Sequence, residues 1–357
     1  MNSYLILDQE DPNYKVPADI VANDELNCID VGWMEQMLPF IDEFTHEGQS
    51  VLDPFAGLGT TLVAATKLNR HAIGIEISAQ RCDSIQQRIN DLQRKHLLPH
   101  NLSYQLIAKD ALYALQTWQL APVQLVLSNI PYFSINTTDS SNTLLYKQAN
   151  YQSYLDYIDQ TFAALHKQTV GGGTIVCMIE NTHNLKGELL PLAWDIAQRL
   201  AKHFTLFDER ILLYPKTKRR TTHSLQTHRQ HEYVLIGKKY LSTAQKEIAQ
   251  HLINKLQKST LSFSVIGSFA TSQHIGDVDL AIPLDASNTL AIINLLAKSF
   301  PLKVWSWNEL LDMNAPKNWN SLFSRHYLRL VLDLGNHGNL QIDLSFTKAL
   351  IENLEQN

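Results

Sequence analysis

Between residues 50 and 239, short apolar segments with the character of buried strands alternate with segments of helical periodicity. Helical segments at residues 60–69 and 78–96 separate the first three apolar segments. This alternation predicts an α/β fold, with a mostly parallel sheet covered by helices on both faces and ligands bound at the carboxyl ends of the strands. The apolar segments are residues 50–55, 71–77, 104–110, 123–130, 173–181 and 232–239.

A different pattern begins near Tyr240. A polar helical stretch at residues 243–259 precedes new strand-like segments, and the last two of these flank the turn Gly335-Asn336-His337-Gly338, which is typical of an antiparallel hairpin. A chain of 357 residues also exceeds what one hydrophobic core usually organises. We therefore expect two domains, residues 1–240 and a smaller α+β domain at 241–357.

We find no pattern typical of a targeting signal, a membrane span or a cysteine-based site in the sequence. The N-terminal residues show no signal-peptide pattern, and no uncharged apolar run is long enough to span a bilayer, so we expect a cytoplasmic protein. Cys28, Cys82 and Cys177 form no Cys-x-x-Cys pair, which argues against a disulfide framework and a structural zinc site.

The formal net charge of −5 argues against a protein that coats nucleic acid generally. One basic stretch lies between residues 216 and 229, and it is either a local nucleic-acid surface or a solvated loop. Its basic residues are Lys216, Lys218, Arg219, Arg220 and Arg229.

A glycine turn follows the first apolar segment, where Asp53 ends a strand and a helix is expected near Thr60. Gly57 and Gly59 allow positive φ angles and a close approach of the backbone to a ligand. A dinucleotide site would require a small residue at Leu62, and a phosphate-binding loop would require Gly-Lys-Ser/Thr, so neither pattern is present.

Three acidic residues end neighbouring strands of the predicted sheet. Asp53 can face a cationic ligand, Glu76 can accept both hydroxyls of a ribose, and Asp110 can accept from an adenine amino group. This arrangement suits the positively charged adenosyl sulfonium of S-adenosylmethionine.

The segment DPFAGLGT, residues 53–60, resembles the first motif of the DNA amino-methyltransferases, which make N6-methyladenine or N4-methylcytosine. The resemblance includes residues 30–44, 128–133 and 231–239 and covers most of residues 30–239. It implies a Rossmann-like methyltransferase fold. The cofactor-binding positions that it implies are Asp53, Phe55, Gly57, Gly59, Thr60, Glu76 and Asp110.

Asn129-Ile130-Pro131-Tyr132 is similar to the Asn-Pro-Pro-Tyr motif of the same family, with Ile130 in place of the first proline. An aromatic amine is a poor nucleophile because its lone pair is delocalised into the ring. The Asn129 side-chain oxygen and the Ile130 carbonyl can each accept one N–H and so direct the lone pair at the methyl group. Tyr132 would stack on the base, Pro131 would shape the turn, and Phe133 would help to close the pocket.

The motif also resembles that of enzymes that methylate guanine in RNA or a glutamine amide in protein. We favour DNA because residues 53–69 and 231–239 look most like the DNA group, and adenine and cytosine both stay open. A target in duplex would have to be flipped out of the stack. The segment at residues 134–151, together with the basic stretch, would supply contacts to the nucleic acid.

A carboxylate cluster is expected in the C-terminal domain. Asp277 and Asp279 are two apart on a short strand and can share a divalent metal, while Asp343 lies between apolar neighbours on a later strand. With Gly267-Ser268 before them, they resemble the nucleotidyltransferase superfamily of DNA polymerase β, over residues 243–350.

This second resemblance implies that Gly267 and Ser268 hold a nucleoside triphosphate, that Asp277 and Asp279 bind Mg²⁺, and that Asp343 completes a two-metal site. Thr271 and Ser272 depart from the usual Arg or Gly of that family.

Our hypothesis is a DNA amino-methyltransferase fused to a minimal nucleotidyltransferase-like domain. One alternative is an enzyme that modifies transfer RNA or another structured RNA. Another is a non-catalytic nucleic-acid-binding regulator, and the C-terminal domain could also only bind nucleotide or nucleic acid.

Overall fold

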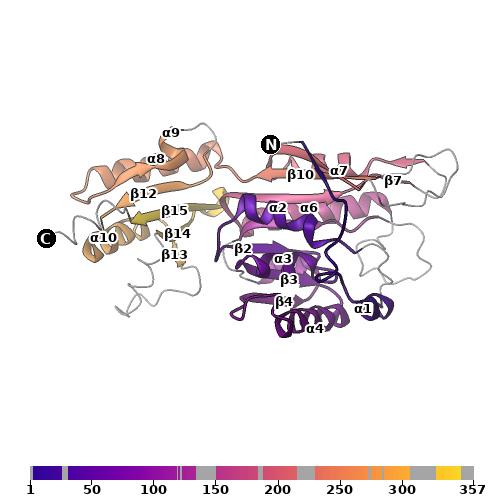
Figure 1. The fold of residues 1–357 in the computed structure, drawn as a ribbon. Coiled ribbons are helices and arrows are strands. Elements are labelled where there is room, and N and C mark those ends of the chain that lie inside the picture. Colours follow the sequence, from indigo (N-terminus) through magenta and orange to yellow (C-terminus); the bar gives the residue numbers. More distant parts are fainter. Residues whose placement is uncertain are drawn as a thin grey trace. The chain divides into compact units, whose positions relative to one another are not determined.

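The computed structural model describes residues 3–25, 31–118, 120, 123–133, 150–183, 188–214, 230–271, 275–283, 285–305 and 327–346. Contacts between residues divide the chain into two compact units, and both are shown in Figure 1. The first unit comprises residues 1–169 and 173–238, and the second comprises residues 170–172 and 239–357. The second unit therefore includes five residues, Val170–Gly172, Lys239 and Tyr240, that a boundary at residue 241 leaves in the first.

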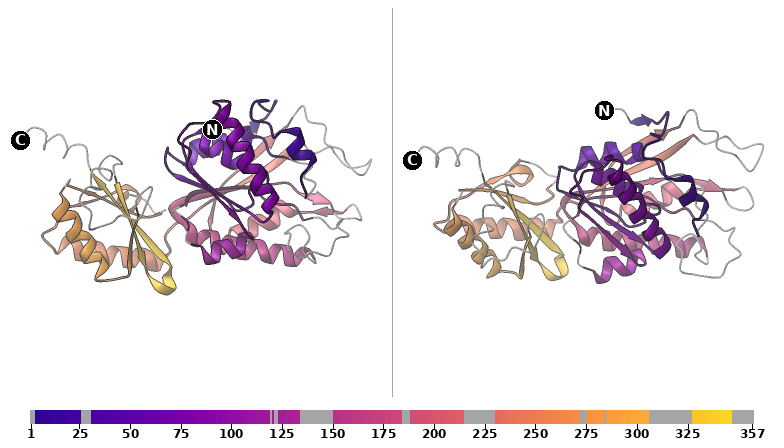
Figure 2. Two further views of the ribbon diagram at one scale, coloured as in Figure 1. Left: turned by 90° about the horizontal axis from the view of Figure 1, so that it is seen from below. Right: turned by 60° about the horizontal axis from the view of Figure 1, so that its bottom comes forward.

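Within the described residues, the first unit is built on an eight-stranded sheet (Figures 1 and 2). In spatial order its strands are β1 (Tyr4–Ile6), β9 (Thr205–Leu213), β10 (His231–Lys238), β6 (Thr169–Ile179), β5 (Val123–Asn129), β2 (Ser50–Asp53), β3 (His71–Glu76) and β4 (Tyr104–Ala108). A small two-stranded sheet of β7 (Thr182–His183) and β8 (Leu189–Leu190) accompanies it.

The centre of this sheet is parallel. Strand β2 pairs in parallel with β3 and β5, β3 with β4, and β5 with β6, whereas β10 pairs antiparallel with both β6 and β9. The mostly parallel α/β sheet predicted from the sequence is thus confirmed.

Helices cover both faces of the sheet because successive strand residues point in opposite directions. Val51 belongs to the core formed with α2, α3 and α4, while Leu52 belongs to the core formed with α5, α6 and α7. The helices of this unit are α1 (Ala18–Ala22), α2 (Met34–Phe44), α3 (Thr60–Lys67), α4 (Ala79–Arg94), α5 (Ala111–Thr117), α6 (Tyr151–Gln168) and α7 (Leu192–Leu200).

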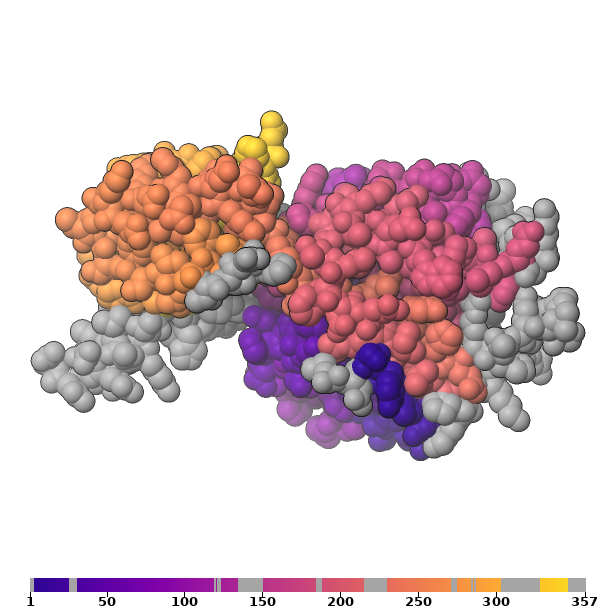
Figure 3. Space-filling view, turned by 90° about the horizontal axis from the view of Figure 1, so that it is seen from above, coloured from indigo at the N-terminus to yellow at the C-terminus, as the bar shows by residue number. Residues whose placement is uncertain are grey.

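The surface of the first unit carries a few large apolar side chains. Trp194 of α7 and Phe207 of β9 are more than half exposed, and the residues of α7 and β9, coloured rose to salmon, lie at the surface in Figure 3. Among the described residues, no helix combines the length and the apolar character needed to cross a membrane.

The second unit contains a five-stranded mixed sheet. Its strands, in spatial order, are β11 (Ser264–Ile266), β12 (Val278–Ile282), β15 (Asn339–Phe346), β14 (Tyr327–Asp333) and β13 (Leu302–Trp305). Its helices are α8 (Thr243–Gln257), α9 (Gly267–Thr271) and α10 (Ala286–Ala297).

The predicted C-terminal hairpin is present in the second unit. Strands β14 and β15 pair antiparallel through seven residue pairs, and one turn of 3-10 helix, Gly335–His337, connects them. Parallel pairing of β12 with β15 then sets Asp279 directly beside Asp343. The register of these strands therefore determines which carboxylates meet.

Candidate functional sites

The first site lies where the strand order of the large sheet reverses direction. Strands β2 and β5 are parallel neighbours, yet the chain continues from β2 toward β3 and β4 on one side and from β5 toward β6 on the other. Ligands in open α/β sheets bind at the carboxyl ends of strands at such a point. Asp53 ends β2 and Asn129 ends β5. The glycine turn and the described residues that follow Asn129, residues 130–133, which we call the Asn129 loop, therefore share one edge of the sheet.

The glycine turn has the conformation that the sequence suggested. Gly57 and Gly59 have φ angles of +54° and +81°, and α3 begins at Thr60. A β-carbon on Gly59 would lie 2.9 Å from the side chain of Ile85, a fixed and fully buried residue of α4. Any residue other than glycine would therefore be strained at position 59 and would clash there.

Asp53 is buried at the end of β2 and is held by neutral donors. Its Oδ1 accepts the Ser128 hydroxyl at 2.6 Å and the Phe55 N–H at 3.0 Å. Burial raises the pKa of Asp53, and the hydrogen bonds from Ser128, Thr61 and Phe55 oppose this rise. A cation near Asp53 would favour its ionised form.

Glu76 ends β3 and faces the glycine turn. Its two oxygens accept the N–H groups of Gly57 at 2.8 Å and Ser78 at 3.0 Å. Burial raises the pKa of Glu76, while these two donors and Arg81 lower it. Each carboxylate oxygen retains a lone pair, so the side chain is oriented and can still accept from ligand hydroxyls.

Asp110 precedes α5, and both of its carboxylate oxygens accept hydrogen bonds within the protein. Its Oδ1 caps the helix by accepting the Tyr113 N–H at 2.9 Å, and its Oδ2 accepts the Tyr157 hydroxyl at 2.6 Å. Such a cap stabilises a helix by about 1 kcal/mol. Asp110 lies two residues beyond the end of β4, and its role toward adenine stays a prediction.

Thr60 makes contacts within the protein. Its hydroxyl donates to the carbonyl of Gly32 at 3.0 Å, and the Arg88 guanidinium donates to Thr60 at 3.2 Å and to the Leu58 carbonyl at 2.9 Å. Burial lowers the pKa of Arg88 to about 10. Thr60 and Arg88 therefore fix the glycine turn against the segment before α2.

Gly32 connects the glycine turn with the Asn129 loop. A methyl group at Gly32 would lie 4.0 Å from the Asn129 side-chain nitrogen, while the Gly32 carbonyl accepts from Thr60. Phe55, from the same glycine turn, and Tyr132, from the Asn129 loop, both pack against the core cluster that contains Leu52.

The Asn129 side chain has an open acceptor. Its Oδ1 is buried and, within the described part of the chain, has no hydrogen-bond partner. An unpaired buried carbonyl costs about 1–3 kcal/mol, so such an atom needs an explanation. A donor supplied by a ligand is the simplest one.

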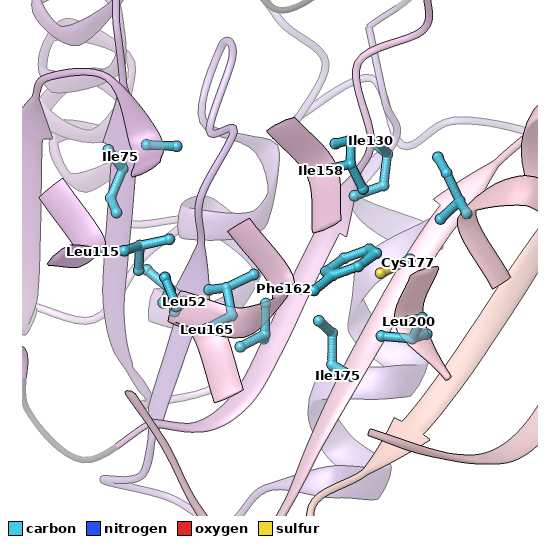
Figure 4. Packing of buried hydrophobic residues seen from close by; sticks show 14 of the residues in the cluster. Leu52, Ile75, Leu115, Ile130, Ile158, Phe162, Leu165, Ile175, Cys177 and Leu200 are labelled. Carbon is cyan, nitrogen blue, oxygen red and sulfur yellow. The ribbon is translucent and has the colours of Figure 1, made fainter. Parts of the chain in front are cut away.

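The residues after Asn129 are firmly held. The Ile130 N–H donates to the Met178 carbonyl at 3.0 Å, and the Ile130 side chain is buried near Ile158 in the core cluster, as Figure 4 shows. The Pro131 carbonyl accepts the Tyr154 hydroxyl at 2.9 Å, and Phe133 packs on the Tyr154 ring. Hydrogen bonds to β6 and α6 therefore hold the backbone at Ile130 and Pro131.

The second site is the carboxylate cluster of the second unit. One carboxylate oxygen from each of Asp277, Asp279 and Asp343 lies within 4.8 Å of the others, a spacing that a metal ion can bridge. Burial and the negative charge of Asp343 raise the pKa of Asp277 well above its ordinary value and that of Asp279 to about 6. Three carboxylates this close need a compensating cation.

Arg329 and Gln341 already compensate part of this charge. Arg329 donates to both oxygens of Asp343, at 2.9 and 2.6 Å, and Gln341 Nε2 donates to Asp277 at 2.8 Å and to Asp343 at 3.2 Å. The Gly171 N–H donates to Gln341 Oε1 at 3.1 Å, which orients the amide.

Gly267 lies against the cluster, with a φ angle of +69°, and a β-carbon there would lie 2.2 Å from Asp279 Oδ2. Ser268 follows it in α9. Asp277 immediately precedes β12, and Asp279 is its second residue, so the short strand brings the pair to the same place.

Some predicted features lie outside the described residues, namely the basic stretch at 216–229, the segment at 134–149, Cys28 and Ser272. Five further residues of the two sites were missed from the sequence, namely Ser128, Arg329, Gln341, Arg88 and Tyr154. Ser128 stands in the quoted segment 128–133 and Arg88 in the helical segment 78–96, but no pattern there marked either residue. Only the strand register and the helix packing bring them to the sites.

Comparison with known proteins matches the segment of the chain that contains the glycine turn. Residues 34–87 match the family model described as DNA methylase. This segment contains α2, Asp53, both glycines and Glu76.

Two curated relatives resemble the chain over short segments. YubD of Escherichia coli, named as a methylase, is 50% identical over 56 residues, which are 16% of this chain and 25% of YubD. The type II methyltransferase M.HindIII of Haemophilus influenzae is 69% identical over 36 residues, 10% of this chain and 12% of that protein. The matches thus span a quarter or less of these relatives.

Among solved structures, TrmN from Thermus thermophilus is similar with 14% identity and a TM-score of 0.37, over 58% of this chain and 48% of that one. The matched family model and the names of both curated relatives refer to methylases or methyltransferases.

Proposed function

We propose that the first unit transfers a methyl group from S-adenosylmethionine to an exocyclic amino group of a nucleobase in DNA. The observation that carries this proposal is the buried, unpartnered Asn129 Oδ1 on the sheet edge that also holds the glycine turn. A buried acceptor with no donor in the described protein is suited to an amino group brought by the substrate.

The residues of the glycine turn suit the cofactor. Asp53 and Glu76 provide negative charge at two adjacent strand ends. Gly57, where a β-carbon would meet only the Phe55 carbonyl at 3.9 Å, leaves room for a ligand along the backbone, and Gly59 supplies the second positive φ angle of the turn. When bound, S-adenosylmethionine supplies an electrophilic methyl group on a positively charged sulfur. Glu76 would accept from the ribose hydroxyls and Asp53 would face the cationic end.

Asn129 and Ile130 would act on the amine. Asn129 Oδ1 would accept one N–H and the Ile130 carbonyl the other, which holds the nitrogen lone pair in one direction. Preorganised acceptors of this kind contribute through alignment, because they need no rearrangement during the reaction. Tyr132, which is half-buried, would stack on the base.

DNA is favoured as the acceptor because the matched family is that of DNA methylases and M.HindIII is a type II methyltransferase. Adenine N6 and cytosine N4 present the same chemistry to Asn129. An RNA acceptor, including transfer RNA, is the alternative outcome.

Labelled cofactor tests this function directly. The full chain is incubated with plasmid DNA, total RNA and protein extract in turn, and nucleosides from the labelled acceptor are identified by mass spectrometry. We expect N6-methyladenine or N4-methylcytosine in DNA, lost in Asn129→Ala. Label only in RNA or protein would reassign the substrate, and label unaffected by Asn129→Ala would overturn the mechanism.

For the second unit we propose a nucleotidyltransferase-like site that binds a divalent cation. The supporting observation is the convergence of Asp277, Asp279 and Asp343 from two strands onto one place. Hard carboxylate oxygens suit Mg²⁺, which would complement the charge that Arg329 leaves uncompensated. Gly267 and Ser268 would contact the triphosphate of a nucleotide.

Cation binding and nucleotidyl transfer are tested separately. Binding of Mn²⁺, a spectroscopic substitute for Mg²⁺, should be lost in the double variant Asp277→Asn with Asp279→Asn. Transfer from labelled nucleoside triphosphates should require Mg²⁺ and the same aspartates. Binding without transfer to any acceptor would leave a nucleotide-binding role, and no difference between wild type and variant in Mn²⁺ binding would remove the metal site.

A further inference from the structure

The peptide group that carries the Ile130 carbonyl is held on both sides. Before it, the Ile130 N–H donates to the Met178 carbonyl of β6 at 3.0 Å. After it, the Pro131 carbonyl accepts the Tyr154 hydroxyl of α6 at 2.9 Å. The carbonyl assigned to the substrate amine therefore lies between two tethers that come from different elements.

The first tether exists because residue 130 is not proline. Proline has no N–H and could not donate to Met178, whereas the motif that the loop resembles has proline at this position. Proline restricts the backbone by its ring. Ile130 instead restricts it through one hydrogen bond and through a side chain that is 2% exposed in the core.

The second tether is a buried phenol with one strong acceptor. Tyr154 is fully buried, and its ring lies 5.6 Å from Phe133 and 6.2 Å from Tyr151, between centroids. Burial raises the pKa of Tyr154 well above its ordinary value, so the hydroxyl keeps its proton and remains a donor. A buried hydroxyl without an acceptor would cost about 1–3 kcal/mol, and the Pro131 carbonyl avoids that cost.

We propose that Tyr154 is a positioning residue for methyl transfer: its hydroxyl fixes the Pro131 carbonyl and thereby aims the neighbouring Ile130 carbonyl at the substrate amine. This inference rests on the proposed function of the first unit. Tyr154 touches the loop and acts through it. If the Ile130 carbonyl no longer points at the amine, the rate of methyl transfer falls because the reaction depends on alignment, while the affinity for the cofactor does not change.

A tyrosine elsewhere in the first unit provides a matched control. Tyr14 is buried, and its hydroxyl donates to the Leu97 carbonyl at 2.9 Å, the same distance as in the bond from Tyr154 to the Pro131 carbonyl. Tyr14→Phe and Tyr154→Phe each remove one hydroxyl and one hydrogen bond to a backbone carbonyl. Only Tyr154→Phe removes a contact to the residues that follow Asn129.

The experiment compares wild type, Tyr154→Phe and Tyr14→Phe on the acceptor that wild type methylates. We expect kcat to fall about tenfold in Tyr154→Phe, with the dissociation constant of S-adenosylhomocysteine unchanged, and to change less than twofold in Tyr14→Phe. Hydrogen exchange of a peptide containing Tyr132 and Phe133 should be faster in Tyr154→Phe only. Melting temperatures establish that all three chains are folded.

The outcomes separate this inference from the function on which it depends. Equal kcat in wild type and Tyr154→Phe, or equal losses in both tyrosine variants, would overturn the positioning role while the methyltransferase stands. Faster exchange in Tyr154→Phe without a change in kcat would overturn it as well. A wild type that methylates no acceptor would overturn both proposals.

Discussion

The two candidate sites use carboxylates in opposite ways. In the first unit, Asp53 and Glu76 each lie among neutral N–H and O–H donors, and the buried amide oxygen Asn129 Oδ1 has no hydrogen-bond partner among the described residues. In the second unit, Asp277, Asp279 and Asp343 lie against one another, and Arg329 provides a positive charge.

This difference indicates which kind of ligand each site favours. Neutral donors hold a carboxylate in place and leave lone pairs for the hydroxyls and the positive charge of an organic ligand. Clustered carboxylates repel one another until a concentrated positive charge arrives. The first arrangement favours a cofactor and an amine, and the second favours a metal ion.

The largest expected effect concerns the open acceptor of the first site. Asn129→Ala removes the oxygen that would accept from the amine, and we expect methyl transfer to fall by about 10²–10³. Cofactor affinity, measured by calorimetry, should change less than threefold. Asn129→Asp keeps an acceptor oxygen at this position and should retain more activity than Asn129→Ala. Equal activity of Asn129→Ala and wild type would remove the distinction between the sites.

The next effect concerns the cation of the second site. Arg329→Met leaves Asp343, whose side chain is 8% exposed, without its ion-pair partner, and breaking a buried pair costs about 3–5 kcal/mol. Thermal unfolding in the presence of a chelator should show this loss, and Mg²⁺ should recover more stability in the variant than in wild type. Arg94→Met, which breaks an exposed pair with Asp91, is the control and should cost less than about 1 kcal/mol.

A third test compares two glycines of the first unit. Gly59→Ala would place a methyl group 2.9 Å from Ile85 at a φ angle of +81°, so we expect a loss of about 1–3 kcal/mol and weaker cofactor binding. Gly48→Ala, with φ +77° and open space around it, carries the backbone strain alone. Equal denaturation midpoints for the two variants would show that packing against α4 does not matter to the glycine turn.

The smallest effect is the pH dependence of cofactor binding. Burial raises the pKa of Asp53 and of Glu76, so the folded chain binds more protons than the unfolded chain. Their contribution to stability is present below the ordinary carboxyl pKa and is lost as pH rises through the raised values. A cationic ligand prefers the ionised forms.

Affinity for S-adenosylmethionine should therefore fall severalfold as pH decreases through these raised values, starting above the ordinary carboxyl range of about 4. Calorimetry from pH 7.5 down to 4.5 measures it, and Glu76→Gln should flatten the profile. A profile that is equally steep in Glu76→Gln would exclude Glu76 as the responsible group.

Local pattern in the sequence predicted several elements of each unit, whereas β1 and β9 were not predicted. The apolar period predicted β2 to β6 and β10, the glycines predicted the start of α3, and the turn at Gly335 predicted the hairpin of β14 and β15. These features depend on neighbours within a few residues, where steric and hydrogen-bonding preferences act directly. The acidic strand ends followed once the strands were placed.

Tertiary structure alone decided which side chains complete each site. Ser128 reaches Asp53 across 75 residues, Tyr154 reaches Pro131 across 23, and Arg329 meets Asp343 because β14 and β15 pair in one register. A one-residue slip of that register would turn Arg329 to the other face of the sheet. Such contacts depend on where distant segments pack, which neither composition nor local period specifies.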